Sequence, residues 1–199
     1  AGFDVVGVDI AKQPHFPFEF IQADWAEPLY ILPGLWEREG VPYAIHASPP
    51  CQAYSWGTRT GREDKWPMLI SDVREHLQLI GAPYAIENVT GARRDMRDPI
   101  LLCGQMFGLG VVRHRLFEMS DPPALTLGHP RCQGLVTSGR AVTVAGHGGD
   151  NRKGKGGRAQ LQAAMGIDWM DDVELRESIP PAFTEWIGAQ LLRALGVAA

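Results

Sequence analysis

The chain has 199 residues, of which 45% are apolar and 21% charged, a composition ordinary for a soluble globular domain with a substantial core. No run approaches the roughly 18 apolar residues of a membrane span, and residues 1–4 lack the features of a signal peptide, so we expect no membrane contact and a cytoplasmic protein. The formal net charge of −4 argues against a surface coated with charge that binds nucleic acid.

Charge is distributed unevenly along the chain. Between Arg113 and Arg158 the sequence has eight basic residues and three acidic ones, so this segment is positive while the remainder is acidic. A positive segment of this kind favours one-sided contact with the phosphates of a nucleic acid. A solvated loop with chance charge is the alternative.

Two apolar stretches near the start are predicted as strands, and each leads to an acidic residue. Residues 5–8 form a buried strand followed by Asp9, and residues 20–25 carry Asp24 near their end. A carboxylate at the end of a Rossmann-type strand can bind the ribose hydroxyls of a nucleoside cofactor. For Asp9 the alternative is a solvated strand end, and Asp24 could also cap a helix predicted over residues 29–39.

The stretch from Ala47 to Ser55 is central to the prediction for the rest of the chain. It follows a short apolar strand over residues 43–46. Pro49 and Pro50 then force the chain out of the sheet, because proline disrupts a helix and cannot donate a backbone hydrogen bond to a neighbouring strand. Cys51 is thereby placed on a stiff loop at the carboxyl end of a strand, the edge at which open α/β sheets bind ligands. A buried, inert cysteine is the alternative.

Two further strands are expected to bring charged side chains to the same region. Residues 84–86 lead into Glu87, whose pKa burial would raise. Residues 111–117 alternate apolar and basic side chains, so Arg113 and Arg115 share one face and need an anion between them, either a phosphate or an acidic side chain. For Glu87 the alternative is a structural ion pair with an arginine.

The remaining segments are predicted to be helices and loops. A polar, glycine-containing loop over residues 56–66 precedes an amphipathic helix over residues 67–80, whose apolar stripe belongs to the core. Residues 121–155 are irregular apart from a β-like stretch at 141–144. Helices are expected over residues 159–165 and 182–195.

Three motifs, in this order, resemble those of the DNA cytosine-5 methyltransferases. They are Ser48-Pro49-Pro50-Cys51-Gln52 with Ser55, then Ile86-Glu87-Asn88-Val89, then Arg113-His114-Arg115. Residues 101–108 resemble the short enzymes of bacteriophages and prophages. The resemblance implies an α/β fold, namely a Rossmann-like S-adenosylmethionine-dependent methyltransferase sheet with a small, reduced target-recognition lobe.

The resemblance implies a reaction and its catalytic residues. The protein would transfer a methyl group from S-adenosylmethionine to carbon 5 of a flipped-out cytosine in DNA, through a covalent intermediate on Cys51. Glu87 would hold or protonate ring nitrogen 3, and Arg115, with Arg113, would stabilise charge near the cytosine carbonyl. The expected setting is restriction-modification, in the cytoplasm of a bacterial host if the gene is carried by a phage.

The resemblance also assigns binding residues. Contacts to the cofactor S-adenosylmethionine would be made by Asp9, Ile10, Asp24, Trp25, Pro49 and Ser178. Contacts to the target base or to double-stranded DNA would be made by Gln52, Ser55, Asn88, Arg152, Lys153 and Lys155. The last three belong to a glycine-rich basic loop that suits a phosphate backbone more than base readout.

No metal site is expected. His129 and Cys132 form one potential pair of zinc ligands, but without a second CxxC or HxxxH pair a zinc site is improbable. The three cysteines, which include Cys51 and Cys103, are odd in number and indicate a reducing compartment.

We divide the chain into residues 1–118 as a catalytic core, residues 119–158 as a reduced target-recognition segment, and residues 159–199 as a C-terminal part returning to the core. The chain departs from the family pattern at Val111, where the family has Gln, and at Arg176 and Glu177, where it has Gly-Asn. The family's first strand and glycine-rich turn should precede Ala1, so we expect the sequence to be an incomplete record of the chain.

Three alternatives stay open. A tRNA cytosine-5 methyltransferase can carry near-identical motifs, and a non-catalytic nucleic-acid-binding homologue would tolerate the departures. A thiol hydrolase would use Cys51 with His46, but His46 is expected to face the core, and no Asn or Asp is spaced to orient it.

Overall fold

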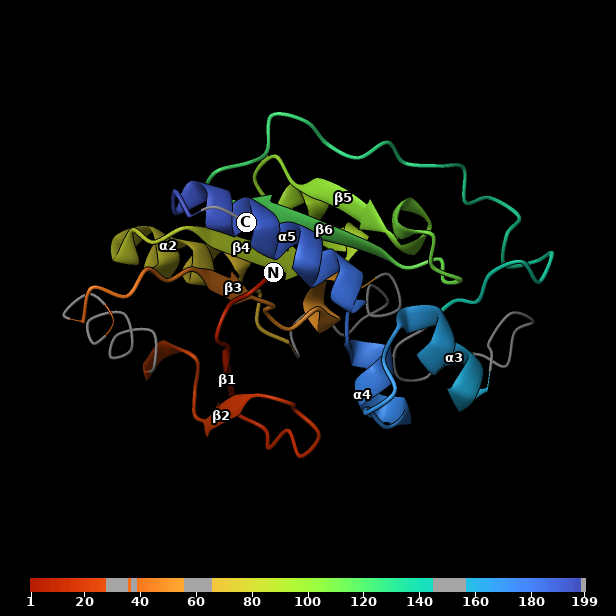
Figure 1. Cartoon of the computed structure of the whole chain (residues 1–199), viewed down its shortest axis with the longest axis horizontal. Helices are drawn as coiled ribbons and strands as arrows, with labels where there is room; N and C mark the ends of the chain where they lie inside the picture. Colours follow the sequence, from red (N-terminus) through yellow and green to blue (C-terminus); the bar gives the residue numbers. More distant parts are fainter. Residues whose placement is uncertain (28–35, 37–38, 56–65, 145–156, 198–199) are drawn as a thin grey trace.

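The computed structural model describes residues 1–27, 36, 39–55, 66–144 and 157–197 (Figure 1). Its centre is a four-stranded sheet in the order β3-β4-β6-β5, in which β3 (Ile45–Ala47) is parallel to β4 (Tyr84–Asn88). Strand β6 (His114–Met119) runs antiparallel to both neighbours, β4 and β5 (Ile100–Cys103). Strands β1 (Val6–Asp9) and β2 (Glu19–Gln22) form a separate parallel pair. The predicted α/β class is confirmed.

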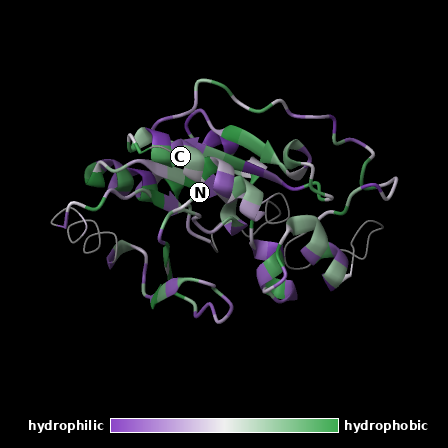
Figure 2. Ribbon diagram, viewed as in Figure 1, coloured by the Kyte–Doolittle hydropathy of each residue, from purple (hydrophilic) through white to green (hydrophobic). Residues whose placement is uncertain are grey.

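Helices cover both faces of the four-stranded sheet, because successive side chains of a strand point to opposite faces. Ile86 and Leu116 pack with the apolar side of α2 (Ile70–Ile80), whereas Ala85 and Phe117 pack with α5 (Pro181–Ala194). The core therefore has an apolar layer on each side of the sheet, and Figure 2 shows hydrophobic residues along its strands. Among the described helices, none combines the length and apolar content needed to cross a membrane.

A smaller apolar cluster lies beside the start of β6. Val111 and Val142, whose backbones form a bridge, pack there with Leu161 of α3 (Arg158–Met165) and Leu175 of α4 (Asp172–Glu177). Three separate parts of the chain thus contribute to one small lobe. The β-like stretch predicted at 141–144 contributes a bridge to this lobe rather than a strand.

The predicted elements are present with shifted boundaries. The helix predicted over residues 67–80 begins at Ile70 and ends before Gly81, which adopts the left-handed conformation with φ of 79°. Strand β6 begins three residues later than predicted, because Val112 donates its N–H to the Val142 carbonyl instead of joining the β6 ladder. Strand β5 and helix α4 were not predicted. Most of the helix predicted over residues 29–39, and the loop predicted over residues 56–66 except Trp66, lie outside the described residues.

The side chain of His46 lies on the face of the sheet that packs against the core, as predicted, but the residue is not enclosed by that core. His46 is exposed on β3, and its ring stacks 6.2 Å from that of Phe117. Strand β3 ends the four-stranded sheet, so the side chains of this short strand are covered less than those of β4.

A buried ion pair joins α2 to the sheet. Arg74 Nε lies 2.5 Å from Glu118 Oε1, and Arg74 Nη2 lies 2.7 Å from Glu118 Oε2. Nη2 also donates to the Asp95 carbonyl at 2.6 Å, and Glu118 Oε2 accepts the Arg97 N–H at 2.8 Å. Hydrogen bonding to Glu118 raises the pKa of Arg74, so this guanidinium stays charged. The ion pair is bidentate, and each partner makes a further hydrogen bond to the backbone. Such additional bonds help a buried ion pair to offset the free energy lost when its charges leave water.

We predict that Arg74→Met lowers the free energy of unfolding by about 3–5 kcal/mol, because Glu118 would stay buried without its partner. The double variant Arg74→Met/Glu118→Leu should recover much of this loss, since an apolar pair needs no compensation. Urea denaturation measures both. Glu75→Gln, at an exposed position of α2, is the control and should change the free energy by less than about 0.5 kcal/mol. A loss below about 1 kcal/mol for Arg74→Met would contradict the prediction.

Candidate active site

The Cys51 loop is fixed against the end of strand β4. Asn88, the last residue of β4, donates from Nδ2 to the Pro49 carbonyl at 2.9 Å. Within the loop, Ser55 Oγ donates to the Cys51 carbonyl at 2.9 Å. Cys51 is thereby held at the carboxyl ends of the parallel strands β3 and β4, where the sequence predicts it.

Glu87 and Arg115 form a buried ion pair between β4 and β6. Arg115 Nε lies 2.7 Å from Glu87 Oε1, and Glu87 is 8% exposed. Burial raises the pKa of the Glu87 carboxyl, while both arginines of the site and a hydrogen bond to Ser48 act in the opposite direction. Within the described part of the chain, Oε1 has no hydrogen-bond donor aligned with it, in spite of the short ion-pair distance. This oxygen can therefore exchange a proton or a hydrogen bond with a ligand.

Arg113 is buried and bonded to backbone carbonyls. Its Nη1 donates to the Val144 carbonyl at 3.2 Å, and its Nη2 donates to the carbonyls of Arg176, at 2.9 Å, and Ser178. Arg113 precedes β6 and joins the sheet to the small lobe and to the segment between α4 and α5. Its guanidinium thus has a structural task, in addition to the catalytic role predicted for it.

Cys51, Glu87 and the two arginines are close enough for their charges to interact. Glu87 interacts with both Arg113 and Arg115, and Cys51 interacts with Arg113. Burial lowers the pKa of Arg113 to about 9, and repulsion by Arg115 is the second cause. The acidic side chain predicted beside the arginines is therefore Glu87. A thiol, a buried acid and two guanidiniums can bind a small polar ring and move a proton to or from it.

Two of the predicted cofactor residues lie at the end of β1, where Asp9 is the last residue of the strand and Ile10 follows it. The Asp9 carboxylate accepts the Ala11 N–H at 2.7 Å and Gln13 Nε2 at 3.1 Å, while Ile10 is 72% exposed. The Ala23 N–H donates to the Asp9 carbonyl at 3.1 Å, which brings the carboxyl ends of β1 and β2 together. A carboxylate has about four acceptor positions, so Asp9 keeps capacity for ribose hydroxyls.

The other predicted cofactor residues have structural partners. Asp24 accepts the N–H two residues further on at 3.1 Å, as in the capping role that the sequence allowed. Trp25 lies edge-on to His76 of α2 at 5.1 Å and packs on the same apolar cluster as the Cys51 loop. Pro49 and Ser178 offer their backbone carbonyls to side chains of the site.

The residues predicted to contact DNA differ in accessibility. Asn88 is fully buried, and besides binding Pro49 it accepts the Val89 N–H at 2.9 Å, so its observed task is to brace the loop. Gln52 and Ser55 are half-buried in the Cys51 loop. Arg152, Lys153 and Lys155 lie outside the described residues, and their contacts stay predictions.

Two kinds of contact at the site were not predicted. The Ser48 side chain hydrogen-bonds to Glu87, and the carbonyls of Arg176 and Ser178 bind Arg113. Ser48 could have been anticipated from its place in the same stiff loop as Cys51. The carbonyl acceptors could not, because every residue has a carbonyl and no side chain marks the ones that are used.

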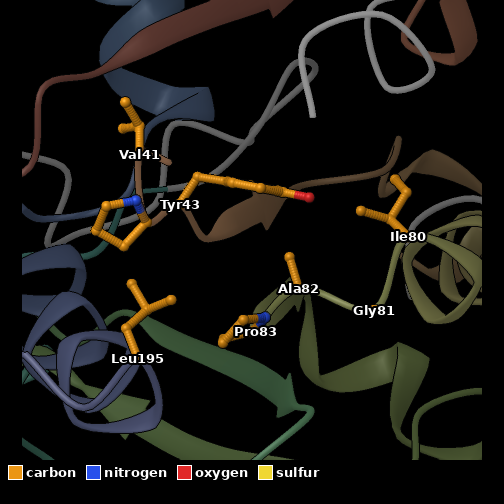
Figure 3. Close-up of a pocket in the computed structure, with 8 residues that line it drawn as sticks. Val41, Tyr43, Ile80, Gly81, Ala82, Pro83 and Leu195 are labelled. Atoms are coloured by element: carbon orange, nitrogen blue, oxygen red, sulfur yellow. The ribbon is translucent and has the colours of Figure 1, made fainter. Parts of the chain in front are cut away.

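Two hollows in the described surface lie at the opposite end of the strands. One, of about 230 Å³, is bounded by Tyr43 before β3, Pro83 before β4 and Leu195 after α5 (Figure 3). The other, of about 370 Å³, adjoins it beside Tyr84 and Ser120. Since α/β sheets bind ligands at the carboxyl ends of their strands, we assign these hollows no part in the chemistry.

We predict that Arg113→Met lowers the free energy of unfolding by about 3 kcal/mol or more, because three carbonyls would lose a charged donor in a buried place. Arg193→Met, at an exposed position of α5, is the matched control with an expected change below about 0.5 kcal/mol. Chemical denaturation followed by circular dichroism measures both. Equal small changes in the two variants would show that the contacts of Arg113 contribute little.

The raised pKa of Glu87 predicts a pH dependence of stability. A carboxyl whose pKa is raised by folding binds its proton more tightly in the folded state, so its stabilising contribution is present at low pH and lost as pH rises through the folded pKa. We expect the wild type to lose stability relative to Glu87→Gln as pH rises from about 4, the ordinary pKa of a glutamate carboxyl, through the raised pKa of the folded state. Denaturation of both proteins across this range measures the difference. If the wild type instead became more stable relative to Glu87→Gln as pH rises, burial would not be the dominant influence on the pKa of Glu87.

Comparison with known proteins gives partial structural similarities. No protein-family model matches the chain, and no curated protein matches its sequence. A DNA modification methyltransferase encoded within a prophage of E. coli is 25% identical, with a TM-score of 0.37, over 59% of this chain and 40% of its own. A variant of DNMT2 from Spodoptera frugiperda is 20% identical, with a TM-score of 0.36, over 65% of this chain and 45% of its own. The chain thus spans less than half the length of either structure.

Proposed function

We propose that the protein transfers a methyl group from S-adenosylmethionine to carbon 5 of a cytosine in double-stranded DNA. The observation that carries the proposal is the position of the Cys51 loop, which is tied by Asn88 to the end of the strand that carries the buried Glu87–Arg115 pair. The order of the three sequence motifs supports the same reaction.

The reaction must overcome the weak nucleophilicity of carbon 5. Addition of the Cys51 thiolate to carbon 6 would move an electron pair of the ring toward nitrogen 3, and carbon 5 would become an enamine carbon. Glu87 would hold nitrogen 3 and share its proton with it, a task favoured by the raised pKa of its carboxyl. Arg113 lies close enough to Cys51 for their charges to interact, and the thiolate of Cys51 is the nucleophilic form.

Arg115 would serve the transition state in two ways. It holds Glu87 in place through the 2.7 Å ion pair, and its remaining donors can reach charge that develops at the cytosine carbonyl. S-adenosylmethionine would supply the electrophilic methyl group to carbon 5, with S-adenosylhomocysteine as the leaving group. Loss of the carbon 5 proton to a base and departure of Cys51 from carbon 6 then restore the aromatic ring and the free thiol.

The ends of β1 and β2 fit the nucleoside part of this cofactor. The free acceptor positions of Asp9 suit two ribose hydroxyls, and the exposed Ile10 offers an apolar surface beside them. Asp24 would accept the adenine amino group, with Trp25 beside the ring. Pro49 and Ser178 would border the cofactor from the Cys51 loop and the segment after α4.

A cytosine inside a duplex is out of reach of Cys51, so the base must be flipped out. Gln52 and Ser55, in the loop that carries Cys51, are the proposed contacts to the flipped nucleotide. Arg152, Lys153 and Lys155 would bind the phosphate backbone, with an affinity that falls as salt rises. Methylation of this kind would suit restriction-modification by a phage-type enzyme in a bacterial cytoplasm.

The test is covalent trapping. In the presence of S-adenosylmethionine, duplex DNA with 5-fluorocytosine should form a complex with the wild type that resists denaturing gel electrophoresis, because after methyl transfer the fluorine at carbon 5 prevents elimination of Cys51. Cys51→Ser should form no such complex and should lower methyl transfer by about 1,000-fold or more. Cys51→Ser should keep the circular dichroism spectrum of the wild type. Full transfer activity in Cys51→Ser would end the proposal.

The same assay separates DNA from RNA acceptors. Radiolabelled methyl transfer to duplex DNA and to tRNA is compared under identical salt. A clear preference for tRNA would move the assignment to an RNA cytosine-5 methyltransferase. Absence of transfer to either, in a protein that still binds nucleic acid, would indicate a non-catalytic homologue.

A further inference from the structure

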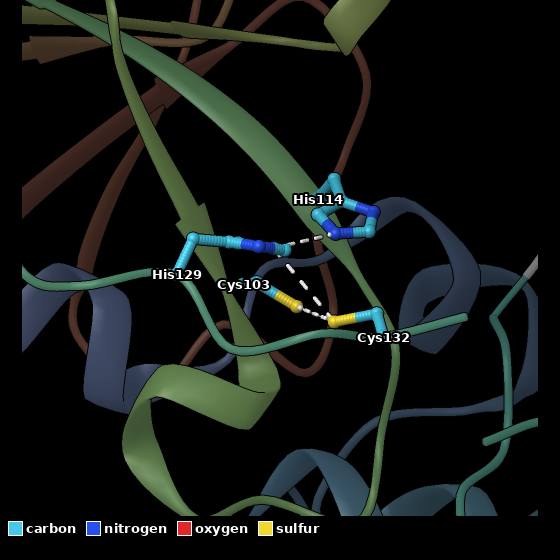
Figure 4. Close-up of side chains that lie close together, drawn as sticks. All are labelled: Cys103, His114, His129 and Cys132. Atoms are coloured by element: carbon cyan, nitrogen blue, oxygen red, sulfur yellow. Dashed lines mark hydrogen bonds between the residues drawn. The ribbon is translucent and has the colours of Figure 1, made fainter. Parts of the chain in front are cut away.

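Four side chains of the kinds that bind zinc point toward one another where strand β5 ends and strand β6 begins (Figure 4). They are Cys103, His114, His129 and Cys132. The four donor atoms all lie within 4.8 Å of one another. The two sulfurs are 3.4 Å apart, the two Nε2 atoms are 3.0 Å apart, and the Cys132 sulfur is 3.7 Å from His129 Nε2.

These separations are close to those around a tetrahedral zinc ion. Bond lengths of about 2.3 Å to sulfur and about 2.05 Å to nitrogen require about 3.8 Å between sulfurs, about 3.3 Å between nitrogens and about 3.6 Å between a sulfur and a nitrogen. The observed contacts agree with these values within about 0.4 Å. Cys103 and Cys132 are free cysteines, so the pair is not a disulfide.

The donor set also selects the metal. Two thiolates with two imidazoles suit Zn²⁺, whereas Mg²⁺ and Ca²⁺ prefer oxygen ligands. We propose that Cys103, His114, His129 and Cys132 bind one zinc ion in a closed, structural site. Binding would release the two thiol protons to solvent without any change of oxidation state. This proposal is independent of the methyl-transfer reaction.

Two of the ligands are positioned by the sheet. Cys103 and His114 are direct partners in the antiparallel ladder of β5 and β6, so their side chains leave the sheet on the same face. The connection between them is braced by Gln105, whose Nε2 donates to the Leu109 carbonyl at 2.7 Å and to the Val111 carbonyl at 3.2 Å. This half of the site is therefore preorganised.

The turn that follows Cys103 is tightly packed. The turn passes so close to Val111 that a Cβ at Gly104 would lie 2.4 Å from the Val111 carbonyl oxygen. Only glycine fits there without a shift of the backbone, which keeps the turn tight beside the sulfur.

The other two ligands come from a segment that has few other anchors. Residues 121–131 are almost all exposed and form a long irregular connection beside the sheet (Figure 1). Among hydrogen bonds between described residues, the side chains of His129 and Cys132 supply the ones that join residues 121–132 to distant parts of the chain. Ordering such a connection costs conformational entropy, which a metal cross-link would offset.

A second group of potential ligands does not match this pattern. His15, Asp171 and Glu174 lie within the same distance limit. Asp171 already accepts the N–H groups of Val173 and Glu174 as the cap of α4, and Glu174 already binds His15 at 2.9 Å. These groups have partners that need no ion, so we assign no metal to them.

The proposed site lies next to the arginine pair. His114 stands between Arg113 and Arg115, and because successive side chains of a strand alternate, the zinc ligand and Arg115 leave β6 on opposite faces. Zinc would therefore fix the start of β6 without entering the space around Glu87. It would also anchor the beginning of the segment 119–158, the part predicted to recognise the target.

Metal content of the full chain tests the proposal. Protein is purified under reducing conditions without chelator and dialysed against metal-free buffer. It should contain about one zinc ion per chain, measured by inductively coupled plasma mass spectrometry. His129→Ala and Cys132→Ser should each contain less than about 0.2 zinc per chain. Cys51→Ser, a matched thiol substitution outside the group, and Arg131→Ala, in the same exposed segment, should both retain the wild-type content.

Cobalt substitution identifies the ligands independently. Co²⁺ in the wild type and in Cys51→Ser should give the intense visible bands of a tetrahedral site and a thiolate charge-transfer band, and both should be lost in Cys132→Ser. Wild-type protein that is folded but holds less than about 0.1 zinc per chain would overturn the proposal. So would equal zinc in all variants, or a Cys103–Cys132 disulfide found by peptide mapping of the reduced preparation.

Discussion

The register of strand β6 between β4 and β5 determines where the buried charges and the proposed zinc ligands of this protein lie. Arg115 and Phe117 leave β6 on the face covered by α5, and Arg115 meets Glu87 there. His114 and Glu118 leave it on the face covered by α2, where Glu118 meets Arg74. A slip of one residue would exchange the faces and separate every one of these pairs.

Each buried charge is compensated by a different part of the chain. Arg74 and Glu118 join α2 to the sheet, and Arg113 joins the sheet to carbonyls before α3, within α4 and after α4. Glu87 is the exception, because burial still favours its neutral form although Arg115 is beside it. An incompletely compensated acid at the carboxyl end of a strand is the arrangement expected where a ligand completes the hydrogen bonding. The proposed chemistry uses this acid.

The segment after β6 presents a different physical problem. Its first residues bury little apolar surface, and exposed side chains such as Leu125 do not pack on the sheet. A short segment without its own core needs a cross-link to keep one conformation. The group formed by Cys103, His114, His129 and Cys132 provides the atoms for such a cross-link beside the proposed catalytic residues.

The sequence by itself determined the α/β class, most helices and strands, and the placement of Cys51 and Glu87 at strand ends. These features depend on the spacing of apolar residues and on prolines, both of which act on the local backbone. The sequence did not determine β5, whose four residues carry no alternation, or the late start of β6. Only the tertiary structure decided that Arg115 pairs with Glu87, that Arg113 binds carbonyls, and that two cysteines meet two histidines. The sequence offered His129 and Cys132 as one potential pair of zinc ligands but did not join Cys103 and His114 to them. These two become neighbours only through the strand register, and spacing along the chain does not encode contacts between distant segments.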